Sequence, residues 1–477
     1  MSTDRIFQKN RHPMKTFSLG MQHVLAMYAG AIVVPMIVGN AIGMTPEQLT
    51  YLIAIDLLAC GVATLMQVWG NRLFGIKLPV VLGCAFQAVS PMIMIGNTDG
   101  LGISAIYGAI IASGLFIFLF SGLFGQLIRL FPPIVTGSVV TIIGVTLIPT
   151  AMTNLGGGQG AEDFGSLPNL ALGFGVLIFI VLLNRLSTGF IRSISILIGL
   201  VAGTAVAAFM GKVDFSPVAD AGWFHAVLPF HFAAPTFHLS AILTMILVAI
   251  VSVVESTGVF MVLGRIVGRD IGSKELARGY RAEGLAIMLG GIFNSFPYTT
   301  YSQNVGLVQM SRVKTRDVVA VAGILLVIVG FVPKIAATAQ LIPASVLGGA
   351  MVALFGLVLS SGVRVLGDQV DLSRHENLFI IACSVGMGLG VSVVPGLFAG
   401  LPEELRILVD NGIIAGSFTA IIMNLLFNGL GEKNAHLKIT GDDGVFGGAE
   451  ETSDPAAGPA GASKTSSAQK NGVGSAV

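Results

Sequence analysis

Long apolar stretches alternate with short polar connections along most of the chain. A bilayer core about 30 Å thick requires roughly 20 apolar residues per helical span, and this length divides the sequence into fourteen segments. The pattern therefore predicts an all-α polytopic membrane protein with fourteen transmembrane segments. The segments centre approximately on Met27, Val62, Val89, Ile110, Ile143, Ile178, Leu200, Ala249, Ile287, Leu307, Leu325, Leu354, Val385 and Ile421.

The third and tenth segments, residues 78–96 and 296–311, differ from the others because they are short, polar and led by a proline. Proline disfavours helical backbone at its own position and at the one before it. We therefore predict short extended stretches at residues 80–86 and 298–303, each followed by a half-helix. The N-termini of two such half-helices would offer N–H donors to a ligand.

The distribution of basic residues supports this segmentation. With the N-terminus inside, fifteen of the 26 Lys and Arg fall in the predicted cytoplasmic loops, and eight fall in the two terminal tails. Only Lys212, Lys334 and Arg406 fall in outside loops. Because basic residues accumulate in cytoplasmic loops, we expect both termini to be cytoplasmic.

A weak internal repeat suggests how the segments are organised. Residues 132–140 (PPIVTGSVV) resemble residues 343–351 (PASVLGGAM) at an offset of 211 (343 minus 132), and Pro79 and Pro297 are 218 apart. Seven spans per repeat, an odd number, would invert the second repeat across the membrane, as in many secondary transporters. The predicted parts are a cytoplasmic tail (1–14), a first repeat (15–211), an extracellular loop (212–237), a second repeat (238–430) and a cytoplasmic tail (431–477), which is Gly/Ala/Ser-rich and expected to be disordered after about residue 441.

Composition narrows the class of protein further. Hydrophobic residues make up 54% of the chain and charged residues 11%, whereas a soluble domain has roughly 25% charged residues. The net charge of +1 gives no indication of a nucleic-acid partner. Cys60, Cys84 and Cys383 are scattered through apolar runs, without the spacing of a metal site or a disulfide framework. We interpret them as packing residues and expect neither a metal nor a cofactor.

Several short motifs then resemble those of one family. Residues 303–306 (QNVG), followed by residues 311–312 (SR), are similar to the signature of the nucleobase–ascorbate transporters, also called nucleobase cation symporters. In that signature Gln/Glu-Asn-x-Gly is followed after four residues by Thr. Ser311 occupies the position of this Thr and retains its hydroxyl group. Further similarities are residues 22–23 (QH), 254–258 (VESTG) and 282–285 (AEGL), the last opening the ninth segment.

The resemblance covers residues 15–430 and is greatest to bacterial xanthine permeases. It implies a fourteen-span fold with core and gate domains, a homodimer in the plasma membrane, and proton-coupled uptake of a purine base by alternating access. Xanthine is the first expected substrate and urate the next, while guanine and hypoxanthine stay open. The expected partners are the purine, the proton and the lipid bilayer.

Two residues are the main candidates for substrate binding. Glu255 lies in the middle of the apolar run 239–264, where a carboxylate is costly and is functional by default. It could accept two hydrogen bonds from neighbouring N–H groups of a planar base, and the family resemblance gives it that role; the alternative is a packing hydrogen bond between helices. Gln303 combines an acceptor and donors on one amide, which suits an oxidised purine; the alternative is that it caps a broken helix.

Three further residues are candidates near the two broken segments. Asn304 could contact the ligand or serve as an N-cap, for which Asn is favoured. In the first repeat Ala85 and Phe86 match Gln303 and Asn304 at the offset of 218. The Phe86 ring could stack on the purine while its backbone N–H donates to it; simple packing is the alternative.

Three other polar residues lie within predicted spans. Glu283 follows Arg281 at a predicted helix start, where an acid is favoured electrostatically; the resemblance instead makes it a residue of proton relay or conformational coupling. His23 can titrate near neutral pH and could carry a proton or orient a neighbour. Asp56 matches no role in the family.

Two other functional classes are alternatives to a purine symporter. An anion transporter with the same inverted-repeat architecture is possible by fold alone, but a buried Glu255 between helix N-termini would repel an anion. An intramembrane metallohydrolase needs paired ligands such as H-E-x-x-H, and residues 375–376 (HE) lack the second histidine. We therefore expect a transporter and no enzyme.

Overall fold

The computed structural model describes residues 13–127, 131–311, 313–394, 396–402, 406 and 409–429. The predicted C-terminal tail and residues 1–12 lie outside the described part. The first half contains α1 (Pro13–Ala41), α2 (Pro46–Trp69), β1 (Leu82–Cys84), η1 (Phe86–Ala88), α3 (Val89–Asn97), α4 (Gly102–Leu127), α5 (Pro133–Leu155), α6 (Leu167–Leu186), α7 (Gly189–Ser193), α8 (Ser195–Phe209) and α9 (Ser216–Asp220). The second half contains α10 (Leu239–Val267), α11 (Ser273–Ile292), β2 (Tyr298–Thr300), α12 (Gln303–Ser311), α13 (Arg316–Gly330), α14 (Pro333–Ala337), η3 (Thr338–Leu341), α15 (Ala344–Gln369), α16 (His375–Val393) and α18 (Gly412–Asn428).

Every predicted segment centre lies within one of these helices. Eight described helices are long and apolar enough to cross a membrane, or nine if one bent pair counts as a span. That pair, Arg316–Gly330 and Pro333–Leu341, bends by 88°, because Pro333 cannot continue the preceding helix. The chain is a multi-pass helical membrane protein, and the full count of fourteen spans stays a prediction.

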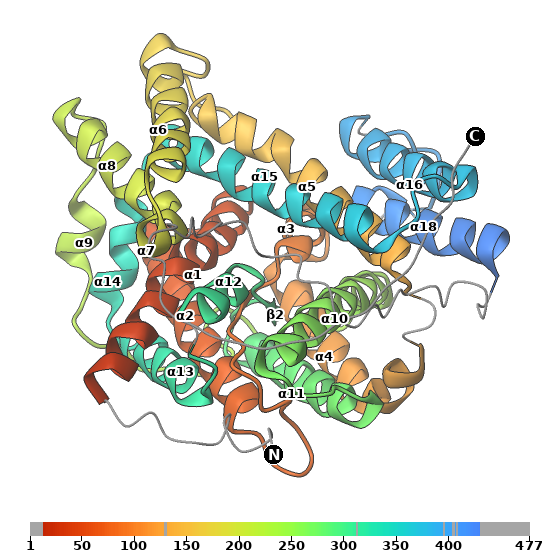
Figure 1. The fold of residues 1–477 in the computed structure, drawn as a ribbon. Helices are drawn as coiled ribbons and strands as arrows, with labels where there is room; N and C mark the ends of the chain where they lie inside the picture. The colour runs from red at the N-terminus through yellow and green to blue at the C-terminus, as the bar shows by residue number, and fades with distance from the viewer. Residues whose placement is uncertain are drawn as a thin grey trace, which may run out of the picture. The chain divides into compact units, whose positions relative to one another are not determined.

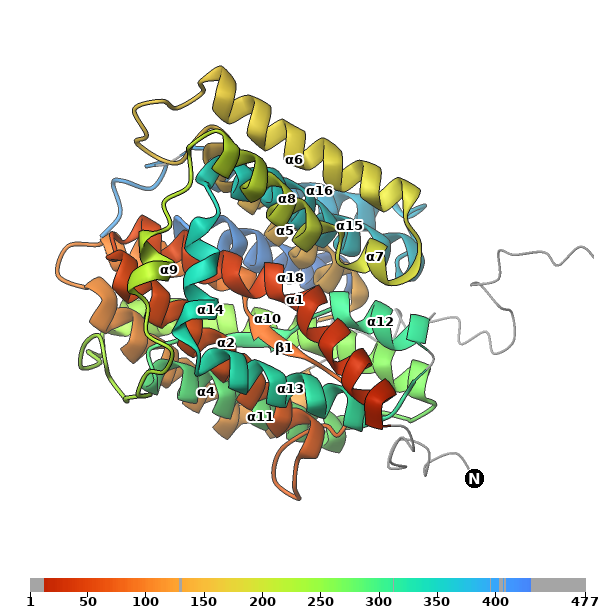
Figure 2. The ribbon, with the colours of Figure 1, turned by 90° about the vertical axis from the view of Figure 1, so that its left-hand side faces the viewer.

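The helices form two groups that are distinct in both Figure 1 and Figure 2. Helices α1–α4 and α10–α13 surround the two strands and are called here the strand-bearing group. Helices α5, α6, α8, α15, α16 and α18 form the second group, called the α5–α15 group after its most extensive helix pair. Each half of the chain contributes helices to both groups.

Glycines allow the main helix pairs to approach closely. A Cβ at Gly114 of α4 would collide with the backbone of Gly284 and Met288 on α11, and a Cβ at Gly61 of α2 would collide with that of Gly323 on α13. The α5–α15 pair has the same feature at Gly144. Small residues at helix interfaces are typical of membrane proteins, which accounts for much of the high glycine content of the apolar runs.

The two strands lie where extended backbone was predicted. They pair antiparallel, with Leu82 opposite Thr300, Gly83 opposite Thr299 and Cys84 opposite Tyr298. Half-helices follow both strands, α3 after η1 and α12 directly. The pairing satisfies the backbone groups of two broken segments inside a helical protein, as buried polar backbone requires.

The connection between the halves, residues 212–237, runs across the strand-bearing group. Its backbone N–H groups donate to the carbonyls of Ile292 (from Phe230) and Ser104 (from Thr236). The Phe232 N–H donates to Asn294 Oδ1 over 3.1 Å. The connection thus packs against the ends of α11 and α4.

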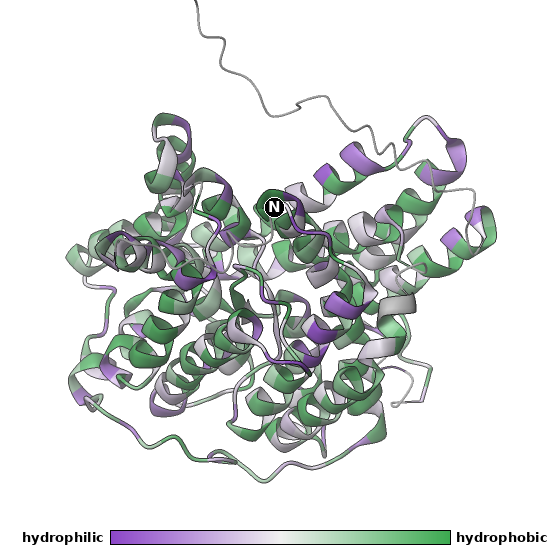
Figure 3. Cartoon of the chain, turned by 60° about the horizontal axis from the view of Figure 1, so that its bottom comes forward, coloured by the Kyte–Doolittle hydropathy of each residue, from purple (hydrophilic) through white to green (hydrophobic). Residues whose placement is uncertain are grey.

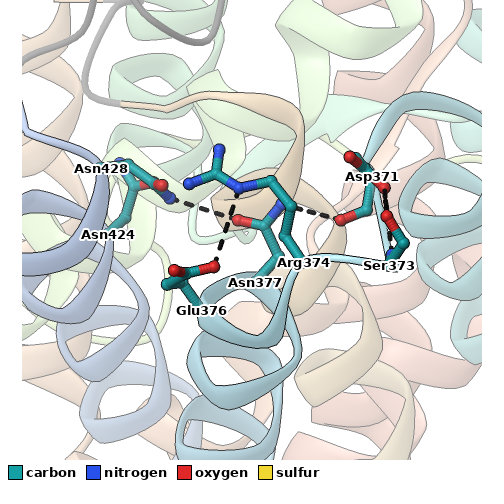
Figure 4. Close-up of polar contacts among 7 residues, drawn as sticks. All are labelled: Asp371, Ser373, Arg374, Glu376, Asn377, Asn424 and Asn428. Atoms are coloured by element: carbon teal, nitrogen blue, oxygen red, sulfur yellow. Dashed lines mark hydrogen bonds and ion pairs between the residues drawn. The ribbon is translucent and has the colours of Figure 1, made fainter.

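Polar contacts also join α16 to α18 at one end of their hairpin (Figure 4). Asn428 Nδ2 donates to Asn377 Oδ1 over 3.4 Å, and Asn377 Nδ2 donates to the Asp371 carbonyl over 2.9 Å. The hydroxyl and N–H of Ser373 donate to the exposed Asp371 carboxyl and hold its pKa below the usual value. These contacts occur where the chain enters and leaves the hairpin.

Hydropathy follows the helical arrangement. Figure 3 shows mostly hydrophobic helices, with hydrophilic residues gathered mainly at helix ends and in connections. Large apolar side chains of the α5–α15 group are exposed, including Leu182, Phe209 and Leu426. Exposed apolar surface of this extent fits a protein that contacts lipid.

Candidate functional site

The strand pair brings the two broken segments together. The Ala85 N–H donates to the Pro297 carbonyl over 2.9 Å, and the Tyr301 N–H donates to the Val81 carbonyl over 2.9 Å. The residue just after each strand is therefore bonded to the residue just before the other strand, and the two broken segments are held together at both ends of the pair. Ala85 is fully buried, and its N–H is already used by the strand pair.

Glu255 lies on α10 beside the end of β1 and is only partly exposed. Its Oε2 accepts a hydrogen bond from Gln87 Nε2 over 3.3 Å, and the same amide donates to the Ser252 hydroxyl over 2.7 Å. Glu255 Oε1 accepts no hydrogen bond from the described residues. Gln87 thus fixes one carboxylate oxygen and leaves the other available.

Gln87 was not among the predicted site residues. Superposing the start of β1 on the start of β2 gives an offset of 216 (298 minus 82), two fewer than the proline spacing of 218. At this offset Gln87 matches Gln303, whereas the proline spacing matched Ala85 to Gln303. The alignment that finds Gln87 is the strand register, which the structure provides and the proline spacing does not.

Glu283 is fully buried and lies close to the same turn of α10. Its Oε1 accepts from the Ser256 hydroxyl over 2.9 Å, while its Oε2 has no partner in the described part of the chain. The prediction that Glu283 opens its helix is wrong, because α11 begins at Ser273 and the carboxylate lies in the middle of it. Its position beside Ser256, the neighbour of Glu255, is therefore not explained by a helix-terminus effect.

The second strand connects to the same hydroxyl. Thr300 Oγ1 donates to Ser256 Oγ over 3.2 Å, and the Thr299 hydroxyl lies 3.2 Å from it. A chain of hydroxyl groups therefore links β2 to Glu283 through α10. Neither the hydroxyls nor this link were predicted from the sequence.

Phe86 is buried among aromatic rings. It stacks on Tyr301 with ring centroids 5.7 Å apart and 17° between the planes, and it meets Phe355 of α15 edge to face at 5.8 Å. The Tyr301 hydroxyl donates to the Cys84 carbonyl over 3.1 Å. Phe86 thus lies where the strand-bearing group meets the α5–α15 group.

The structure pairs Asn304 with His23. Asn304 Nδ2 donates to the His23 carbonyl and lies within hydrogen-bond distance of His23 Nδ1, both at 3.1 Å. Asn304 Oδ1 is buried without a partner among the described residues. Because α12 begins at Gln303, Asn304 is not its N-cap, and Gln303 makes no side-chain hydrogen bond within the described structure.

Asp56, which had no predicted role, accepts four hydrogen bonds in the strand-bearing group. Its Oδ1 accepts from Ser295 Oγ (2.7 Å), Cys84 Sγ (2.8 Å) and Tyr298 Oη (3.0 Å), and its Oδ2 accepts from Cys60 Sγ (3.8 Å). Cys60 and Cys84 are therefore hydrogen-bond donors and not only packing residues. Within the described ranges no three His, Cys, Asp or Glu side chains are grouped as metal ligands.

Comparison with known sequences identifies relatives along most of the chain. Residues 14–397 match the family model described as "Permease family". The nucleobase transporter PlUacP of Paenibacillus larvae is 65% identical, over 87% of this chain and 94% of its own. The xanthine permease of Bacillus subtilis is 59% identical over the same shares, and the uric acid permease PucK of that organism is 57% identical over 90% of this chain and 100% of its own.

Solved structures give a more distant likeness. The transmembrane domain of the cyanobacterial bicarbonate transporter BicA has a TM-score of 0.59 at 15% identity, covering 80% of this chain and 98% of that one. The murine anion transporter Slc26a9 in its inward-facing state has a TM-score of 0.61 at 12% identity, covering 88% of this chain and 69% of that one. These structures support the fold alone. The family model and the close relatives together show that the chain belongs to this permease family, the nucleobase–ascorbate transporters.

Proposed function

We propose that the protein takes up a purine base across the plasma membrane, coupled to protons, by alternating access. The observation that carries the proposal is the Glu255 carboxylate, with one oxygen held by Gln87 and the other accepting no hydrogen bond from the described residues. An ionised carboxylate in this setting is suited to accept N–H groups from the edge of a planar base. In this proposal the Phe86 ring stacks on the base, and Gln303 forms hydrogen bonds with the edge of the base that carries both C=O and N–H groups.

The choice of purine follows from the relatives. They are named for nucleobases, xanthine and uric acid, and an oxidised purine offers both C=O and N–H groups to the amide of Gln303. We propose xanthine first and urate as the alternative. The anion transporters share the fold only, and bicarbonate has no pair of N–H groups to donate to the Glu255 carboxylate.

We further propose that the two halves are inverted repeats, with both termini cytoplasmic. Under this proposal α1–α4 correspond to α10–α13, and α6 and α8 correspond to α16 and α18. The helix contacts support this correspondence. The α4–α11 pair matches the α13–α2 pair, and the α10–α4 pair matches the α1–α13 pair. In this scheme the strand-bearing group is the core and the α5–α15 group is the gate, and a homodimer would form as the family resemblance implies.

Glu283 and His23 are the proposed coupling residues. The buried Glu283 has one oxygen without a donor, and His23 contacts Asn304 beside Gln303. At 100 mV the entry of one proton contributes about 2.3 kcal/mol, which corresponds to roughly 50-fold accumulation of a neutral base. One titrating carboxyl would therefore be sufficient.

Uptake of labelled xanthine into cells deficient in purine transport tests the proposal. We expect concentrative uptake that unlabelled urate reduces, that uracil leaves unchanged and that a protonophore abolishes. Asp368→Asn, at an exposed carboxyl of α15, serves as the matched control and should transport normally. Absence of uptake with normal amounts of protein in the membrane would reject the proposal, and uptake of bicarbonate instead would favour the anion-transporter alternative.

A further inference from the structure

The Asp56 carboxylate forms a second buried polar cluster in the strand-bearing group, separate from Glu255. Its donors come from β1, from the connection before β2, from β2 itself and from α2, its own helix. Cys84 and Tyr298, two of the donors, are directly opposite each other in the strand register. One carboxylate therefore contacts both strands at the same rung of the ladder.

We infer that Asp56 is a positioning residue that fixes the register of the two strands and, through them, both halves of the substrate site. The part of the inference that concerns the substrate site rests on the proposed function, which supplies both the site residues and the ligand used in the second test. Cys84 immediately precedes Ala85 and Phe86, and Tyr298 lies five residues before Gln303. A shift of either strand would therefore move the residues that contact the substrate.

A carboxylate is the side chain that this cluster requires. Asp56 is fully buried, and no Lys, Arg or His forms an ion pair with it among the described residues. Burial of a carboxylate without a cation is costly unless hydrogen bonds compensate. The four donors supply them. An asparagine with its oxygen in place of Oδ1 would keep three of these donors, but it would lose the charge that strengthens each hydrogen bond and would turn its NH₂ group toward the Cys60 thiol.

The rest of the strand pair is held from other directions. The Leu82 N–H donates to the Thr64 hydroxyl of α2 over 3.0 Å, at the opposite end of β1. Thr300, opposite Leu82, donates to Ser256 of α10. Asp56 is the side chain that ties the two strands to a common acceptor, so its loss should loosen the Cys84–Tyr298 end more than the Leu82–Thr300 end.

The first test measures the strand itself and needs no substrate. In a Cys60→Ser, Cys383→Ala background, which keeps a hydroxyl donor beside Asp56 Oδ2, Cys84 is the remaining thiol of the chain, and it is fully buried. We expect slow labelling of Cys84 by N-ethylmaleimide, and labelling at least tenfold faster after Asp56→Asn. Ser295→Ala combined with Tyr298→Phe removes two donors while keeping the carboxylate and should raise the rate in the same direction.

The second test measures xanthine binding to the purified protein. Asp56→Asn should weaken xanthine affinity about tenfold. The same variant should also discriminate less between urate and hypoxanthine. Asp56→Glu should bind xanthine more tightly than Asp56→Asn, because it keeps both acceptor oxygens. Asp368→Asn should leave the affinity unchanged. Thermal unfolding of every variant confirms that the folded protein is being compared.

The outcomes separate this inference from the proposed function. A lower unfolding temperature of Asp56→Asn with wild-type xanthine affinity and wild-type labelling of Cys84 would mean that Asp56 only stabilises the fold, and the inference would be overturned. If the wild-type protein binds no xanthine, the proposed function fails, while the labelling rate of Cys84 still decides the role of Asp56.

Discussion

Asp56 on α2 and Glu283 on α11 are both fully buried acids next to the same pair of strands, yet their surroundings differ. Asp56 accepts hydrogen bonds from four side chains, which use both of its oxygens. Glu283 accepts one side-chain hydrogen bond, from Ser256, and its Oε2 has no partner in the described structure.

This difference shows that burial alone does not distinguish an acid with a structural role from one with a role in binding or coupling. A carboxylate with a full set of donors is fixed in one position, whereas an unsatisfied one carries a desolvation cost that a proton or a ligand can relieve. Glu255 also has only one oxygen held by a donor, but its side chain is partly exposed, so a ligand can reach it. This difference supports the proposed roles of Asp56 in positioning the strands, of Glu283 in proton coupling and of Glu255 in substrate binding.

The largest expected effect is that of Glu255→Gln on xanthine binding. The change replaces a charged acceptor pair by one acceptor and a misplaced donor, so affinity should fall at least about a hundredfold. Glu255→Asp keeps the charge but retracts it by one methylene and should fall between the two. Equilibrium binding to the purified proteins gives the order, and equal affinity of wild type and Glu255→Gln would remove the carboxylate from the substrate contacts.

Gln303→Glu should have the next largest effect, of roughly 30-fold on xanthine uptake, or about 2 kcal/mol. It removes the amide donors and adds a second acid to the proposed substrate site. Substrate specificity should change as well, so that uracil competes with xanthine for uptake. Inhibition of labelled xanthine uptake by a panel of purines and uracil measures this, and an unchanged profile would show that Gln303 does not touch the base.

Gln87→Leu should weaken xanthine binding about tenfold, because Glu255 loses the donor that holds Oε2. Ser252→Ala is the matched variant, since it removes the other acceptor of the Gln87 amide and leaves the contact with Glu255 in place. We expect Ser252→Ala to cost less than Gln87→Leu. The reverse order in the same binding assay would mean that the Gln87 amide acts mainly through its contact with Ser252 in the packing of α10, and not by holding the Glu255 carboxylate.

The smallest effect is expected for Asn304→Ala, which removes two contacts with His23. Uptake should fall only about threefold, and stability by about 1 kcal/mol, because a neutral hydrogen bond contributes little net free energy. Thermal unfolding and uptake are measured on the same preparation. A loss of xanthine affinity greater than that of Gln87→Leu would identify Asn304 as a direct ligand contact.

Local sequence features predicted the broken segments, which the structure confirms, and singled out Glu255 as a candidate, because both signals are short-range. A proline interrupts each of the two segments, and an acid within an apolar run is conspicuous by itself. The surroundings of these features were not predictable in the same way. The Gln87 contact with Glu255 joins residues 168 apart in the chain, and no local pattern encodes that separation.

Asp56 illustrates the same limit more strongly. Its donors Cys84, Ser295 and Tyr298 lie 28, 239 and 242 residues away along the chain. The sequence therefore showed an isolated acid with no assigned role, and Cys84 was interpreted as an apolar packing residue. For Glu283 the error was one of position, because the polar start of α11 at Ser273 extends the helix ten residues ahead of the acid.

The most direct test of the contrast between the two buried acids is proton movement during xanthine transport in proteoliposomes. Wild type should acidify the lumen as xanthine enters. Asp56→Asn should move xanthine more slowly but with the same ratio of protons to xanthine, whereas Glu283→Gln should exchange labelled for unlabelled xanthine without moving protons. Retention of the wild-type proton ratio by Glu283→Gln, or its loss in Asp56→Asn, would contradict the assignment of coupling to Glu283 and positioning to Asp56.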